Sequence, residues 1–112
     1  MLNKVVYRQV LKGLENLRKQ HDEDRREKPT ALPIDWKSCI IRLIEHVARE
    51  NRTHLPRGQA EETLKYLEKQ GLIVPYHGGY TFPGTEIPTR EQIQAHAEAT
   101  LQHLGLSTKQ QS

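Results

Sequence analysis

The sequence of 112 residues has few of the features that mark secreted, membrane or zinc-binding proteins. Its single cysteine, Cys39, excludes a disulfide framework and a cysteine-rich zinc site. There is no run of about 18 apolar residues, so we expect no membrane-spanning helix. Lys4 and Arg8 interrupt the start of the chain, which also lacks an apolar stretch, so we expect no signal peptide. These absences predict a small cytoplasmic protein.

Aromatic residues are also scarce, at 5% of the chain, and the mean hydropathy is low, at −0.79. A chain of this length has room for one hydrophobic core, so residues 1–112 are expected to form a single domain. Because so few residues are apolar, the core must be small and most of each helix must face water.

Sequence patterns for catalysis, phosphate binding or metal coordination are missing as well. The histidines have no zinc-binding spacing, and His96 and His103 lie seven positions apart. Cys39 lies in an apolar stretch, where burial would make its thiol unreactive. The Gly78-Gly79 pair lies at the tip of a predicted hairpin and not in a phosphate-binding loop. We therefore expect no enzymatic activity, no bound metal and no cofactor.

The chain is modestly basic, with 17 Lys and Arg residues against 14 Asp and Glu residues. The excess is in residues 1–56, which carry 12 basic and 8 acidic side chains. Residues 57–112 carry 5 basic and 6 acidic ones. A net charge of +3 is compatible with a polyanionic partner but does not require one.

Residues 3–27 have the apolar periodicity of an amphipathic helix. Its apolar positions are Tyr7, Val10, Leu14, Leu17 and His21. The side away from them is basic and carries Lys4, Arg8, Lys12 and Lys19. The apolar stripe predicts either packing onto the rest of the domain or dimerisation through Tyr7, Val10, Leu14 and Leu17. The basic side fits either a solvated surface or a helix that lies along phosphates. Residues 28–34 contain two prolines and are expected to form a linker.

Residues 35–51 are predicted to form the most buried helix, with Asp35 as its N-cap. Its apolar face consists of Trp36, Ile40, Leu43, Ile44 and Val47, and Cys39 and Ile41 widen it. A third helix over 57–70 directs Ala60, Leu64 and Leu67 inward. Gly71 supplies the left-handed residue that ends this helix, and Leu72 is expected to pack back on it.

Residues 72–82 are predicted to form a β-hairpin, because two short β-prone runs flank His77-Gly78-Gly79. Pro75 cannot donate to a ladder, so its strand is expected at an edge. A fourth helix over 89–104 begins with a capping box formed by Thr89 and Gln92. Its apolar stripe consists of Ile93, Ala97, Leu101 and Leu104, and Gly105 with Leu106 ends it. Residues 107–112 are expected to be a disordered tail. The fold class is thus predicted to be mainly α with a small β-hairpin.

The end of the third helix and the hairpin resemble the winged helix-turn-helix superfamily over about residues 35–82. The residues that carry the resemblance are LKYLEKQGLIV at 64–74 and GGYTF at 78–82. The resemblance implies a winged-helix-like domain with additional N- and C-terminal helices. Residues 57–70 would be its recognition helix and residues 72–82 its wing. Residues 35–51 would then precede the turn, and the N-terminal helix would either open the unit or lie outside it.

The resemblance also implies that the recognition helix enters the major groove of double-stranded DNA. Arg57 and Gln59 at its start suit the edges of guanine and adenine. The complete set of implied contacts comprises Arg52, Thr53 and His54 in the turn, Arg57, Gln59, Lys65 and Lys69 on the helix, and His77 and Tyr80 in the wing. On this hypothesis the protein is a small transcriptional regulator or accessory factor.

Glu61 and Glu62 disfavour DNA, because they place carboxylates on the outward face of the same helix. A structural explanation is that carboxylates near the start of a helix stabilise it through its dipole, and that Glu61 pairs with Lys65. The alternative function is a non-enzymatic protein–protein interaction module, such as an adaptor, complex subunit or inhibitor. It would bind its partner through the Glu61 and Glu62 face or through the N-terminal helix.

Overall fold

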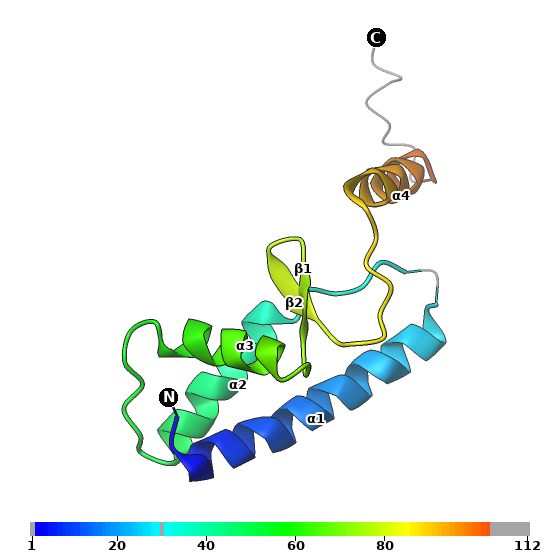
Figure 1. Cartoon of the computed structure of the whole chain (residues 1–112). Coiled ribbons are helices and arrows are strands. Elements are labelled where there is room, and N and C mark those ends of the chain that lie inside the picture. Colours follow the sequence, from blue (N-terminus) through cyan, green and yellow to red (C-terminus); the bar gives the residue numbers. More distant parts are fainter. Residues whose placement is uncertain (1, 30, 104–112) are drawn as a thin grey trace.

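The computed structural model describes residues 2–29 and 31–103. Within them, helices α1 (Lys4–Glu27), α2 (Lys37–Glu50) and α3 (Gln59–Lys69) are followed by strands β1 (Val74–Tyr76) and β2 (Gly79–Thr81) and by helix α4 (Arg90–His103) (Figure 1). The predicted class, mainly α with a small hairpin, is confirmed. Leu104, Gly105 and the tail expected over 107–112 lie outside the described residues.

Helix α1 packs along α2 through the apolar stripe that the sequence predicts. Asn3 caps its start, because the Asn3 side chain accepts a hydrogen bond from the Val6 amide at 2.9 Å. Val10 and Leu14 are only 0% and 4% exposed and belong to the core. The structure therefore assigns them to packing within the chain, and they have no surface to offer a second copy. Tyr7 and Leu17 are half-buried against the same core.

Helix α2 begins at Lys37, two residues later than predicted, and its N-cap is Trp36. Asp35 still serves the helix start, because its Oδ1 accepts a hydrogen bond from the Lys37 amide at 2.9 Å. The same oxygen accepts from the Tyr80 amide at 3.0 Å, and the Trp36 amide donates to the Tyr80 carbonyl at 2.8 Å. The segment before α2 is thereby joined to the outer edge of β2.

The prediction that Cys39 is buried is wrong, because its side chain is exposed. Helix α2 buries Ile40, Ile44 and Val47 on the side that meets the rest of the core. Cys39 precedes Ile40 by one residue, which places it about 100° around the helix, outside the covered side.

Helix α3 starts after Gly58 and ends in a Schellman motif. Gly71 has a φ of 76°, and its amide donates to the Glu68 carbonyl at 3.0 Å. The Leu72 amide donates to the Leu67 carbonyl, also at 3.0 Å. The predicted helix stop at Gly71 is therefore confirmed. Leu72 does not pack as expected, since it is 36% exposed and Ile73, at 1%, enters the core instead.

The hairpin pairs Val74 with Thr81, Pro75 with Tyr80 and Tyr76 with Gly79. His77 and Gly78 form its turn with φ values of 42° and 88°, the pair of positive angles that a type I′ turn requires. The Tyr80 amide and carbonyl bond to Asp35 and Trp36, so they point away from β1. Pro75, which pairs with Tyr80, therefore has its nitrogen on the free edge of β1. The prediction that the Pro75 strand is an edge is confirmed.

An aromatic cluster closes the core where the chain leaves the hairpin. The Phe82 ring lies 5.3 Å from the His21 ring and 5.7 Å from the Trp36 ring, measured between ring centroids. His21 is buried at the inner side of α1, as its place in the apolar stripe predicts. The cluster therefore links α1, the start of α2 and the end of the hairpin.

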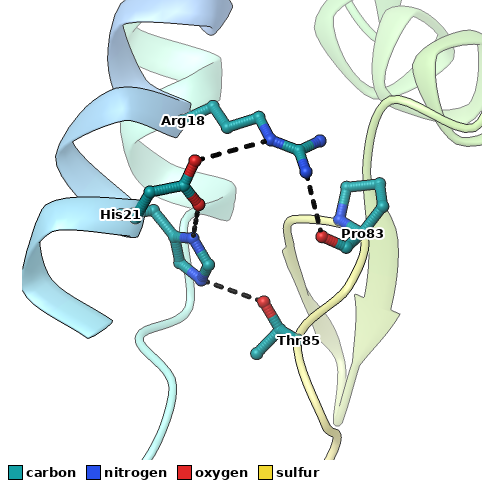
Figure 2. Close-up of polar contacts among 5 residues, drawn as sticks. Arg18, His21, Pro83 and Thr85 are labelled. Atoms are coloured by element: carbon teal, nitrogen blue, oxygen red, sulfur yellow. Dashed lines mark hydrogen bonds and ion pairs between the residues drawn. The ribbon is translucent and has the colours of Figure 1, made fainter. Parts of the chain in front are cut away.

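Polar contacts hold the segment after β2 against α1 (Figure 2). Arg18 Nη2 donates to the Pro83 carbonyl at 3.3 Å, and its Nε lies 3.9 Å from an Asp22 carboxylate oxygen. His21 Nε2 lies 3.0 Å from the Thr85 hydroxyl, and its Nδ1 lies 3.2 Å from Asp22. The chain is thus fixed on α1 before it leads to α4.

Helix α4 begins with the predicted capping box, which is confirmed by two reciprocal hydrogen bonds. The Thr89 amide donates to Gln92 Oε1 at 2.8 Å, and the Gln92 amide donates to Thr89 Oγ1 at 3.1 Å. The helix stands away from the other helices (Figure 1). Its Ala97 and Leu101 are consequently exposed, although the sequence pattern assigns them to a stripe.

Candidate nucleic-acid interface

The outward side of α3 presents two unpartnered lysines. Ala60, Leu64 and Leu67 are buried on the inner side of the helix. Lys65 and Lys69 lie one turn apart on the opposite side and are exposed. Within residues 2–29 and 31–103, neither side chain forms a hydrogen bond or ion pair. Both lysines are therefore free to bind an anionic partner, and their contact with DNA stays a prediction.

The turn before α3 adds two further free cations. Arg52, with a φ of 51°, and Arg57 are exposed, as is His54. Neither arginine side chain has a partner among the described residues. Thr53 is half-buried, and its hydroxyl donates to the Asn51 carbonyl at 3.3 Å. Helix α3 has no side-chain cap at Gly58, and the carboxylates of Glu61 and Glu62 in its first turn oppose the positive end of its dipole.

Gln59 differs from the other predicted contacts, because it faces the neighbouring helix α1. It is half-buried and lines a cavity of about 200 Å³ together with Leu2, Tyr7 and Glu62. The Tyr7 ring contacts the Tyr66 ring edge-to-face at 5.5 Å. Burial, followed by the proximity of Tyr66, raises the pKa of Tyr7. Sequence reasoning missed this α1–α3 contact, for which the only signal is the position of Tyr7 on the apolar stripe.

The two predicted wing contacts, Tyr80 and His77, are both engaged within the chain. The Tyr80 hydroxyl donates to Glu68 Oε1 at 2.9 Å, and burial, then this hydrogen bond, raises the pKa of Tyr80. Tyr80 nonetheless lies beside Lys65 and Lys69, with which it lines a shallow hollow. His77 at the hairpin tip lies apart from them, and its Nε2 donates to the Pro88 carbonyl at 2.6 Å.

Acidic side chains lie on the same helix as the lysines. Glu61, Glu62 and Glu68 are exposed, and Glu68 faces the hairpin through its bond to Tyr80. The predicted Glu61–Lys65 ion pair is absent among the described residues, because both side chains extend into solvent, where such a pair is worth little. The outward side of α3 therefore has mixed charge, and its excess of free cations comes from the turn that precedes it.

Other kinds of site receive no support from the described part of the chain. Within it, no group of three or more His, Cys, Asp or Glu side chains is placed to hold a metal ion. None of its helices has both the length and the apolar character needed to cross a bilayer. Comparisons with protein-family models, curated proteins and solved structures find no match.

Proposed function

We propose that residues 35–82 form a winged-helix-type unit that binds double-stranded DNA, with α3 directed into the major groove. One observation carries this proposal. Four cationic side chains on α3 and the turn before it have no partner within the described residues: Arg52, Arg57, Lys65 and Lys69. Unpaired cations at the start and on the outer side of one helix are suited to neutralise the phosphates that border a groove.

The chain order supports the same proposal. Three helices precede the hairpin, and the segment between α1 and α2 bonds to the outer edge of β2. The packing of α1 on α2 supports the interpretation in which α1 is added to residues 35–82 as the first helix of the unit. In this arrangement the outer side of α3 lies next to the hairpin residue Tyr80, which supports α3 as the recognition helix.

Binding to a labelled random-sequence duplex tests the proposal. Fluorescence polarisation is expected to show an affinity that falls steeply between roughly 50 and 200 mM salt, because phosphate contacts release counterions. Arg57→Ala is expected to weaken binding to a selected site by about 1–3 kcal/mol and to relax its sequence preference. Arg90→Ala, on α4, removes the same charge away from the site and serves as the control. Absence of binding at the lowest salt with micromolar protein would refute the proposal.

A second candidate, a protein–protein interaction module, is favoured by the carboxylates of Glu61 and Glu62. Both are exposed and have no partner within the described residues. An acidic pair of this kind suits a basic protein surface at least as well as DNA.

Charge reversal at this pair separates the two functions. If α3 faces DNA, the double variant Glu61→Lys and Glu62→Lys is expected to bind a random duplex more tightly, by roughly tenfold or more at low salt. If the pair binds a protein, the same variant is expected to lose that partner in a pull-down and to bind DNA no better than its control. The control reverses Glu45 and Glu91, which are exposed on α2 and α4.

A further inference from the structure

The hairpin side of α3 is poorly suited to hold a DNA backbone. Residues 71–88 contain no lysine or arginine. Glu68 faces the hairpin, and Glu61 lies two turns earlier on the same side of the helix. The polar side chains of Tyr80 and His77 are already bonded within the chain. The hairpin itself therefore offers a duplex no free cation, and the lysines of α3 beside it share that flank with carboxylates.

The opposite flank of α3 is bordered by the N-terminal half of α1. Tyr7 contacts Tyr66, and the cavity between the two helices is closed by Leu2 and Tyr7 on the α1 side. The two helices meet through these side chains, and the Tyr7 and Tyr66 ring centroids lie 5.5 Å apart. The major groove is about 12 Å wide, so a helix that borders one in the groove faces the sugar–phosphate rim.

The part of α1 that lies next to this contact is basic. Lys4, Arg8 and Lys12 repeat at intervals of four residues and are exposed, and their side chains have no partner within the described part of the chain. Lys4, Arg8 and Lys12 lie about 60°, 100° and 140° around the helix from Tyr7, on the side away from buried Val10. The three positions span about 12 Å along the axis, a length over which each DNA strand carries three to four phosphates.

We infer that Lys4, Arg8 and Lys12 of α1 form a second phosphate-binding surface, which contacts the backbone of the same duplex that α3 enters. This inference rests on the proposed function. It assigns the backbone contact to the first helix and not to the hairpin, because α1 has the free cations and the hairpin has none.

Salt dependence of duplex binding tests the inference, because each phosphate contact contributes about 0.9 to the slope of log K against log salt. In one variant Lys4, Arg8 and Lys12 are all replaced by glutamine. The slope is negative, and we expect its magnitude to fall by about 2–3 in this variant. The control replaces Arg42, Arg49 and Arg90 by glutamine. These residues are exposed on α2 and α4, and their replacement removes the same total charge. It is expected to change the slope by less than about 1.

The outcomes distinguish this inference from the proposed function. If the wild-type chain binds no duplex, both are refuted. If the wild type binds and Lys65→Gln with Lys69→Gln lowers the slope while the α1 variant does not, the inference is refuted and the proposed function stands. Equal losses in the α1 variant and its control would also refute the inference, because they would indicate a diffuse effect of net charge. Arg8→Gln alone, with an expected change of about 0.9, provides a second measurement in a minimally altered chain.

Discussion

Replacement of Phe82 by alanine is expected to lower the free energy of unfolding by about 3–5 kcal/mol. Phe82 is 1% exposed and packs between the rings of His21 and Trp36. Its removal leaves a cavity at the point where α1, the start of α2 and the hairpin meet. Because small domains are stable by only about 5–15 kcal/mol, this single change removes a large part of the total.

The fluorescence of Trp36, the only tryptophan in the chain, reports this unfolding directly during a urea titration. Phe82→Leu keeps most of the buried volume and is expected to cost less than about 1.5 kcal/mol. A loss below about 1 kcal/mol in the alanine variant would contradict the role of this cluster as the junction of the fold.

Replacement of Gly79 by alanine is expected to destabilise the protein by about 2–3 kcal/mol. A Cβ atom at this position would overlap the carboxylate of Asp35. That carboxylate accepts hydrogen bonds from the Lys37 and Tyr80 amides, so it cannot move aside without losing them. The substitution therefore separates the start of α2 from the hairpin.

A double-mutant cycle isolates this effect from any general cost of alanine in the strand. In an Asp35→Ala background the carboxylate is gone, and Gly79→Ala is expected to cost less than about 1 kcal/mol. The quantity to be measured is the difference in unfolding free energy between the two backgrounds. Equal costs in both would show that Asp35 is not the reason for glycine at this position.

Local signals in the sequence were sufficient for the order of the elements and for several of their ends, but α2 and α3 each begin two residues later than predicted. The Thr89–Gln92 capping box, the stop at Gly71 and the turn before Gly79 each depend on residues within a few positions of one another. Cys39 was misplaced because the apolar run in α2 is wider than the side that its neighbours cover. Asp35 bonds to Tyr80, 45 residues away, and no local pattern reveals that contact.

The candidate site was predictable to a similar extent. Periodicity alone placed Lys65 and Lys69 on the outer side of α3, because it also identified the inner side. It could not reveal that Gln59 faces α1 or that the Tyr80 hydroxyl is taken by Glu68, since both depend on how distant segments pack. For the same reason, the position of α1 beside α3 emerges only from the folded chain.

The bonding of the two strand edges has a consequence for self-association. The outer edge of β2 is occupied by Trp36 and Asp35, and the free edge of β1 lacks an amide donor at Pro75. A strand from another molecule would therefore find one edge filled and the other without a donor at its centre. Such edges prevent the sheet from growing between molecules and so protect the protein from amyloid-like assembly at high concentration.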